Sequence, residues 1–288
     1  VMLKDRILIN VLENVKGKIY SVTMGSQGFT KPKIMGLLKN GHLTLASSSI
    51  YSNDFFFSYE GFLTPESLYF YKGIAKKYSL MKSLPSKFVS KNMTVKQKWA
   101  TSKDGTKIPY FVVGKSSQLK KGNAPTLLYG YGGFEISINP SYSATIGRAW
   151  LERGGVYVSA NIRGGGEFGP SWHQAGLKTK RQIVYDDFIA VGEDLIARKV
   201  TTPEHLGTHG RSNGGLLMGV MFTQRPDLFN AVAVGVPLLD MRRYDKLLAG
   251  ASWVGEYGDP DDTGAEGEYI RNLSPYHNIR PDTDYPVP

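Results

Sequence analysis

Residues 210–214 read Gly-Arg-Ser-Asn-Gly, a pattern that permits few local folds. In a G-x-S-x-G pentapeptide the serine lies on a sharp turn between a strand and a helix. Glycines are needed on both sides because the two backbones approach too closely for a Cβ atom. Residues 205–209 can form the strand, and the apolar residues 214–223 can form a helix that ends before Pro226. The sequence therefore predicts strand, serine turn and buried helix, rather than a serine that only caps a helix.

The spacing of apolar residues changes near residue 93. Before it, strand-like runs lie at residues 6–12, 18–23, 42–47, 54–59 and 67–71. They recur roughly every 10–14 residues, with turn residues between them. This spacing indicates antiparallel sheet and is typical of propeller blades. We predict that residues 1–92 form a partial antiparallel β-propeller of about two blades. A small open sheet leaves unpaired edges, so this segment is expected to be part of a larger assembly.

After residue 93, strand-like runs alternate with helical ones. The expected strands are residues 109–113, 126–129, 156–162 and 231–236, and a helix is expected at 186–199. Runs of β-branched residues between helices indicate a mostly parallel sheet with helices on both faces. Residues 93–288 are therefore predicted to form an α/β domain.

Several kinds of site are disfavoured by the composition and by residue spacing. The chain has no cysteine, which excludes disulfides, thiolate catalysis and cysteine-based zinc sites. No two histidines have metal-ligand spacing, so we expect neither a metal nor a cofactor. Residues 164–169 satisfy G-x-G-x-x-G, but a dinucleotide site needs a helix to begin there. Pro170 and Trp172 favour a loop instead.

The net charge of +10 is unevenly distributed, because residues 1–92 carry 13 basic and 5 acidic side chains. The lysines are scattered among strand residues, which favours exposed strand edges over nucleic-acid binding. No apolar run reaches the ~18 residues of a membrane span, so no membrane contact is expected. Asp5 and Arg6 are not typical of a signal peptide. The sequence is compatible with a cytoplasmic or a periplasmic location and with any oligomeric state.

Taken together, certain segments resemble the prolyl oligopeptidase family of serine peptidases. They are LYGYGGF at 128–134, ANIRGGGE at 160–167, GRSNGGLL at 210–217 and QRPDLF at 224–229. The resemblance is strong over residues 93–288 and looser before them, where residues 62–65 match the last propeller blade. It implies an α/β-hydrolase domain after a β-propeller, and a short peptide as the substrate.

The resemblance also implies roles for individual residues. Ser212 resembles the nucleophile. The backbone N–H of Asn213 and the hydroxyl of Tyr131 resemble the two oxyanion donors, which acyl transfer needs at the developing negative charge.

A substrate pocket is implied in the same way. Trp253 resembles the flat ring on which the family stacks a substrate proline, and Tyr257 and Phe134 would complete the pocket. A proline ring has no amide N–H, so an apolar aromatic wall suits it.

Two departures from the family pattern bear on function. Arg211 replaces a glycine and resembles the related oligopeptidase B branch, which cleaves after Lys or Arg with acidic pocket residues. Glu256 could be one such acid, but Trp253 occupies the place of another, which favours cleavage after proline.

The second departure is that the family's catalytic aspartate and histidine would both follow Pro288. His277 matches a position that is not catalytic, and His209 is expected to be directed by sheet packing. We therefore expect residues 93–288 to lack the C-terminal part of the domain and the chain to be inactive as given. A general esterase on the same fold and a non-catalytic peptide-binding fragment are the remaining alternatives.

Overall fold

The computed structural model describes residues 1–288, and these form two compact units. The first unit is Val1–Lys91 together with Asn139–Ala149, and the second is Asn92–Ile138 together with Trp150–Pro288. The boundary that we predict after residue 92 lies beside the observed division. Nothing in the sequence pattern indicated that residues 139–149 belong to the first unit.

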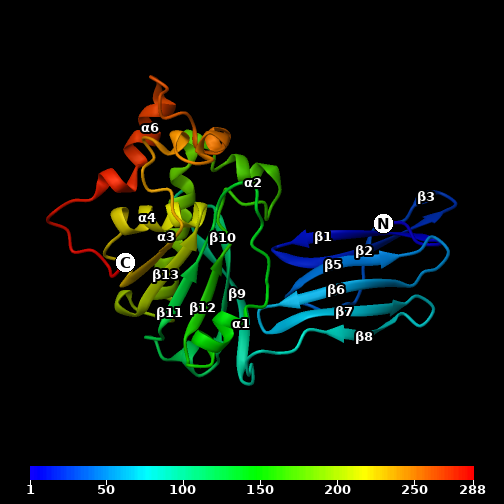
Figure 1. Ribbon diagram of the computed structural model, residues 1–288. Coiled ribbons are helices and arrows are strands. Elements are labelled where there is room, and N and C mark those ends of the chain that lie inside the picture. The colour runs from blue at the N-terminus through cyan, green and yellow to red at the C-terminus, as the bar shows by residue number, and fades with distance from the viewer. The chain divides into compact units, whose positions relative to one another are not determined.

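The first unit contains two four-stranded antiparallel sheets (Figure 1). The strands of one sheet are β1 (Arg6–Glu13), β2 (Lys16–Gly25), β3 (Gly28–Phe29) and β4 (Lys33–Ile34), with β1, β3 and β4 all pairing with β2. The other sheet has the order β5 (His42–Ser48), β6 (Phe55–Gly61), β7 (Thr64–Lys72) and β8 (Lys77–Ser83). These antiparallel sheets agree with a partial β-propeller. Every residue of β8 is exposed, so no alternation of apolar residues signalled that strand.

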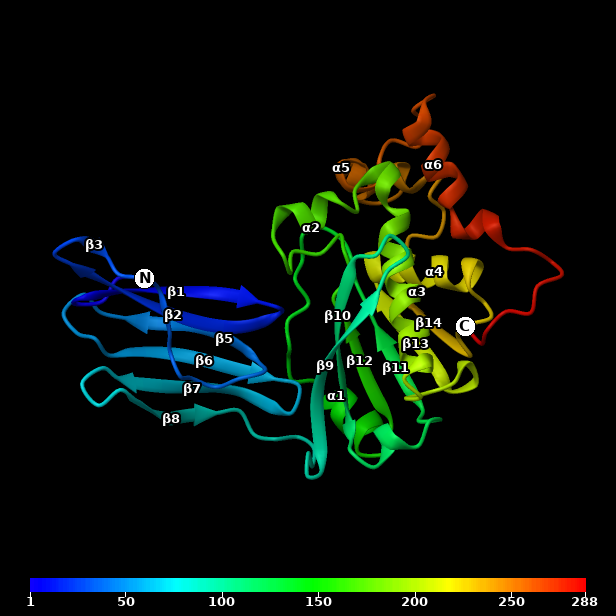
Figure 2. The ribbon, with the colours of Figure 1, turned by 180° about the vertical axis from the view of Figure 1, so that it is seen from behind.

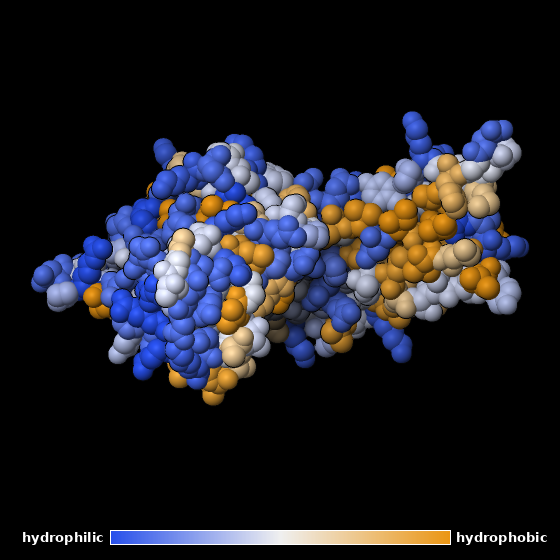
Figure 3. Space-filling view, turned by 90° about the horizontal axis from the view of Figure 1, so that it is seen from above, coloured by the Kyte–Doolittle hydropathy of each residue, from blue (hydrophilic) through white to orange (hydrophobic).

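Aromatic pairs between β6 and β7 form much of the core of the second sheet. Phe55 stacks on Tyr71 with ring centroids 4.8 Å apart, and Phe57 stacks on Tyr69 at 5.3 Å. The two pairs lie on one face because alternate residues of a strand point the same way. Figure 3 shows apolar side chains gathered on part of the surface of this unit. Exposed apolar patches of this kind are usual where a sheet packs against another element, which agrees with a partial propeller.

Tyr142 anchors residues 139–149 to the first unit. Its hydroxyl accepts a hydrogen bond from the amide of Lys87 at 2.7 Å, and its ring stacks on Phe88 at 4.9 Å. Its amide donates to Glu60 at 2.9 Å. A short helix, α1 (Ala144–Ile146), follows and continues into a π-helical turn, η2 (Gly147–Leu151).

The second unit is built on a six-stranded sheet with the order β14-β13-β11-β12-β10-β9. The strands are β9 (Met93–Thr101), β10 (Lys107–Lys115), β11 (Thr126–Tyr129), β12 (Val156–Ala160), β13 (Leu206–Arg211) and β14 (Ala231–Gly235). Four neighbouring strands run parallel to one another, namely β12, β11, β13 and β14. Strand β10 pairs antiparallel with β12 on one side and with β9 on the other. This is the predicted α/β-hydrolase fold, with a mostly parallel sheet.

Two helices lie against one face of this sheet (Figure 2). Helix α3 (Gln182–Ala197) packs on β9 and β10, helix α4 (Asn213–Gln224) packs on β13 and β14, and the two helices touch each other. Helix α4 is buried continuously from Asn213 to Met221, as expected for a helix that is apolar on all sides. On the other face, the half-buried Tyr129 and His209 lie side by side with ring centroids 4.9 Å apart.

Short helices connect these elements. They are α2 (Pro170–Gln174), α5 (Val254–Tyr257), α6 (Ala265–Leu273) and the 3₁₀ turns η1 (Gln118–Lys120), η3 (Lys178–Lys180), η4 (Pro203–His205), η5 (Tyr244–Lys246), η6 (Gly250–Trp253) and η7 (Pro275–Asn278). The loop predicted for residues 164–169 is present, but it ends there, because α2 begins at Pro170. A proline is tolerated at the first helical position because its missing N–H would have no partner there. None of the helices combines the length and apolar character that crossing a membrane requires.

Candidate active site

Ser212 lies on the turn between β13 and α4, as the pentapeptide predicts. Its side chain is exposed and its φ is +57°, a conformation that non-glycine residues rarely adopt outside constrained sites. The turn is held by a hydrogen bond from the amide of Ser212 to Gly235 O at 3.0 Å. A Cβ on Gly210 would lie 2.3 Å from Gly214 O, and one on Gly214 would lie 2.9 Å from Gly130 O. Both glycines are therefore required by close backbone contacts.

Asn213 is the first residue of α4 and is 1% exposed. The first amides of a helix have no acceptor within the helix, so the N–H of Asn213 is available to a ligand. The positive end of the helix dipole makes this position favourable for a negative charge.

Tyr131 follows β11 on the segment of residues 130–134, which we term the Tyr131 loop. Burial raises the pKa of Tyr131, whereas a hydrogen bond with the Ser212 hydroxyl acts in the opposite direction. The pKa stays above its ordinary value of 10.0, so the phenol keeps its proton at neutral pH. The structure thus brings Ser212, the amide of Asn213 and the hydroxyl of Tyr131 together.

The three aromatic residues of the predicted pocket lie at different depths. Phe134 is half-buried and meets Tyr257 in an edge-to-face contact with ring centroids 5.7 Å apart. Tyr257 is 0% exposed and donates its hydroxyl to Asn213 Oδ1 at 2.9 Å, so it supports the Phe134 ring from behind. Trp253 is half-buried at the end of η6 and packs against the core of the second unit.

Glu256 is 5% exposed, and both of its carboxylate oxygens already accept hydrogen bonds. One oxygen accepts from the guanidinium of Arg181 and from the amide of Phe134, both at 3.0 Å. The other is 2.7 Å from His173 Nε2. Glu256 is therefore not a free acid that could receive a Lys or Arg side chain. Arg181 is not among the predicted site residues, because its hydrogen-bond partners are distant from it in the sequence.

None of the five histidines is hydrogen-bonded to Ser212. His277 Nδ1 is 2.8 Å from the hydroxyl of Ser274, a contact suited to the structural role that we expect. His209 faces Tyr129 and Tyr157 on the sheet, and burial lowers its pKa. Among residues 1–288, no histidine is therefore placed to accept the proton of Ser212 through a direct hydrogen bond.

One carboxylate cluster could hold a cation. Side-chain oxygens of Asp245, Asp259 and Asp261 lie within 4.8 Å of one another. The ammonium of Lys246 is 2.7 Å from Asp261 and already supplies a positive charge there. This cluster contains none of the predicted site residues.

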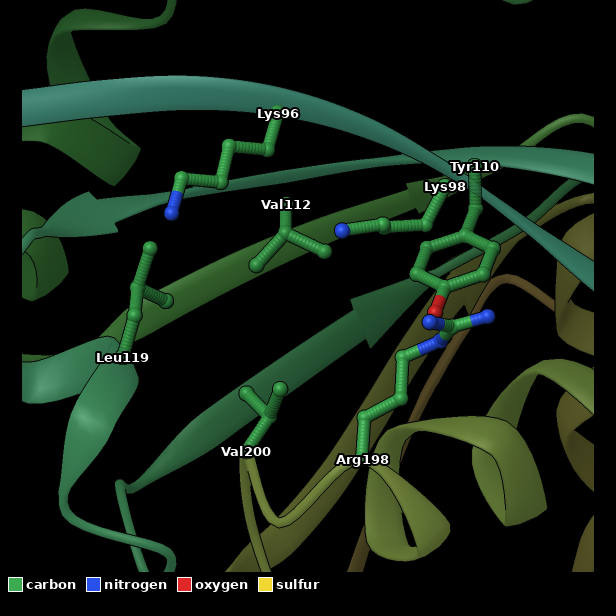
Figure 4. Close-up of a pocket in the computed structure, with 7 residues that line it drawn as sticks. All are labelled: Lys96, Lys98, Tyr110, Val112, Leu119, Arg198 and Val200. Atoms are coloured by element: carbon green, nitrogen blue, oxygen red, sulfur yellow. The ribbon is translucent and has the colours of Figure 1, made fainter.

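A separate pocket of about 310 Å³ lies between β9, β10 and the end of α3 (Figure 4). Lys96, Lys98 and Arg198 give it a basic lining, and Tyr110 closes one side. Tyr110 and Arg198 both donate to Asp194, at 2.5 and 2.6 Å. No serine or threonine lines this pocket, and it contains none of the predicted site residues.

The fold and the serine turn define an α/β-hydrolase. The model of the prolyl oligopeptidase family matches residues 140–287, and the chain belongs to that family.

Individual relatives support this assignment. An uncharacterized peptidase from Sinorhizobium fredii is 51% identical over 99% of this chain and 39% of its own length. A prolyl endopeptidase from Elizabethkingia meningoseptica is 42% identical over 81% of this chain and 33% of its own length. The structure of a post-proline cleaving enzyme from Rickettsia typhi is 41% identical with a TM-score of 0.86, over 99% of this chain and 41% of that one. The chain thus spans about two fifths or less of these relatives.

Proposed function

We propose that this chain carries the nucleophile and the oxyanion donors of a serine peptidase that cleaves short peptides after proline. The observation that carries the proposal is Ser212 at positive φ on the turn between β13 and α4, directly before the unpaired first amides of that helix. The oxygen of Ser212 attacks the substrate carbonyl carbon, and the carbonyl oxygen becomes an anion that accepts from Asn213 N–H and the Tyr131 hydroxyl. The amine then leaves with a proton, and water releases the acyl group from Ser212.

The proton of Ser212 needs a base, and serine is a poor nucleophile without one. Since no histidine of residues 1–288 contacts Ser212, this chain alone is expected to bind peptides without turning them over. Activity is expected when the chain is joined to the remaining part of a relative's hydrolase domain.

Cleavage after proline is supported by the surroundings of Glu256. An acidic pocket for Lys or Arg would need a carboxylate that is free to pair with the substrate, and Glu256 is already paired with Arg181 and His173. Phe134, with Tyr257 behind it, offers an aromatic surface to an apolar ring. The names of the relatives from Elizabethkingia meningoseptica and Rickettsia typhi agree with this substrate class.

A fluorophosphonate probe, which reacts with activated serines, tests the nucleophile. We would compare the 288-residue chain with a chimera in which it replaces the matching segment of the 51% identical relative. The chimera should be labelled rapidly and stoichiometrically, and Ser212→Ala should abolish the labelling. Rapid labelling of the chain alone that is lost in His277→Ala would contradict the absence of a base.

Substrate class is tested with the same chimera. A peptide amide ending in proline should be cleaved faster than the matched amide ending in arginine and faster than a short-chain ester. Preference for arginine would favour the oligopeptidase B alternative, and preference for the ester would favour a general esterase. Peptide binding by the chimera without cleavage of any of the three would favour a non-catalytic role.

A further inference from the structure

Arg181 is a fully buried cation next to the serine turn. It lies at the N-cap position of α3, where its side chain makes no capping hydrogen bond, and it is 1% exposed. Burial alone would lower the pKa of Arg181, but Tyr185, Tyr257 and Glu256 raise it overall, so the guanidinium stays charged. A charge in such a position needs partners that satisfy its donors.

The two terminal nitrogens of Arg181 donate to the serine turn and to residues that contact it, whereas the buried Nε has no hydrogen-bond partner. One terminal nitrogen donates to Glu256 at 3.0 Å. The other donates to Asn213 Oδ1 and, at 3.4 Å, to the carbonyl of Gly132. The face of the guanidinium lies over the ring of Tyr257, 4.5 Å from its centroid.

Three side chains in this network hold the backbone of the Tyr131 loop. The side-chain amide of Asn213 donates to Tyr131 O at 2.6 Å, and Arg181 donates to Gly132 O. Glu256 accepts from the amide of Phe134 at 3.0 Å. Since Arg181 also binds both Asn213 and Glu256, the three contacts are one connected network.

The network links the two predicted oxyanion donors. Asn213 contributes its own N–H, and its side chain holds the residue that contributes the Tyr131 hydroxyl. A catalytic or binding group must be held within about 0.5 Å of its productive position to be effective. The planar fork of an arginine can meet several acceptors at fixed angles, which a lysine ammonium cannot reproduce. A buried ion pair contributes little net stability compared with apolar packing. The advantage of Arg181 therefore lies in holding its acceptors in a fixed geometry.

We propose that Arg181 is a positioning residue that fixes the Asn213 and Tyr131 donors relative to Ser212. The inference rests on the proposed function, because it concerns the oxyanion that forms at Ser212. Arg181 acts through Asn213, Gly132 and Glu256 and does not touch the substrate.

A peptide boronate ending in proline tests this inference on the 288-residue chain itself. Ser212 Oγ adds to boron, its proton passes to solvent, and boron becomes a tetrahedral anion with an oxygen for the two donors. Boron-11 NMR distinguishes this adduct from the free trigonal acid. The matched peptide amide, which lacks boron, measures binding of the uncharged ground state.

The main variant is the double substitution Arg181→Met with Glu256→Gln. It removes both charges together, so no unpaired charge is left buried, and the glutamine can still accept from Phe134. We expect the boronate to bind at least about tenfold more weakly, less than the 10²–10³ that loss of an oxyanion donor costs, and the amide to bind as before. Arg181→Lys should give an intermediate loss, because it keeps the charge without the fork.

Arg163→Lys is the matched control. Arg163 is 6% exposed and is paired with the buried Asp187 at 2.6 Å, but it contacts neither Asn213 nor Glu256. This variant should lower stability while leaving the ratio of boronate to amide affinity unchanged.

The outcomes separate the two proposals. If the double variant and Arg181→Lys keep the wild-type ratio of boronate to amide affinity, Arg181 is structural only and the inference is wrong. If both ligands weaken equally, the substitutions have disturbed the whole site and positioning of the donors is likewise refuted. If the unaltered chain forms no tetrahedral adduct that depends on Ser212, the same comparison is made in the chimera, where absence of the adduct refutes the proposed function and this inference with it.

Discussion

Replacing Gly210 with alanine tests whether backbone contact at the serine turn limits the stability of the second unit. The new Cβ would lie 2.3 Å from Gly214 O and 2.7 Å from Gly214 C. These are backbone atoms, and the hydrogen bond from Gly215 N to Ser212 O at 2.8 Å holds them in place. The helix start would therefore have to move away from β13.

The size of the effect follows from this overlap. Overpacking a well-packed site costs about 1–3 kcal/mol, and a contact with backbone on both sides belongs at the upper end, about 3 kcal/mol. Gly255, in α5, is the matched control, because a Cβ there meets nothing within 4 Å. Gly255→Ala should stabilise by about 0.5–1 kcal/mol, since alanine loses less entropy in a helix.

Urea unfolding followed by tryptophan fluorescence measures both variants. All four tryptophans (Trp99, Trp150, Trp172 and Trp253) lie in the second unit, so the signal reports that unit. With a urea slope of about 2 kcal/mol per M, Gly210→Ala should lower the midpoint by about 1.5 M. Gly255→Ala should raise it slightly. A Gly210→Ala midpoint equal to or above that of the wild type would refute the steric reasoning.

Three further predictions concern single side chains. In the chimera, Trp253→Ala should lower kcat/KM for proline substrates by ~1–3 kcal/mol, whereas an unchanged proline preference would assign the pocket to another residue. Burial lowers the pKa of His209 below its ordinary 6.5, so its contribution to stability is complete above pH 6.5 and is lost as the pH falls through the lower folded value. His209→Phe should therefore flatten the decline in the urea midpoint between pH 7 and pH 5, and an unaltered decline would exclude this residue as its source. Ser274→Ala should cost about 1–3 kcal/mol in the same unfolding assay, because the buried Met241 amide loses its acceptor; a smaller loss would mean that another group replaces the hydroxyl.

The parts of this fold that could be predicted are those that depend on residues close together in the sequence. Gly210 is required by atoms of Gly214, only four residues away, so the pentapeptide itself predicts the turn. Buried strands such as β11 and β14 are short apolar runs, which are read directly from the sequence. Strand β8 was missed because all of it is exposed, and α2 was missed because its proline was read as a break.

The supports of the site could not be predicted in the same way. Arg181 and Glu256 are 75 residues apart, and no repeat or motif links them. Glu256 was considered only as a substrate-binding acid, because its sequence neighbours do not reveal that Arg181 and His173 occupy it. Such pairing depends on how distant segments pack, which the family resemblance did not supply for these residues.

The division of the first unit has a consequence for how the chain is made. Ribosomes deliver residues 1–91 first, yet the Tyr142 contacts with Lys87 and Glu60 cannot form until 139–149 have emerged. By then residues 92–138, three strands of the other unit, are already outside. The first unit therefore cannot complete these contacts until three strands of the other unit have been synthesised. Cleavage of the chain after residue 91 would give two polypeptides, but residues 139–149 of the first unit would remain on the second polypeptide.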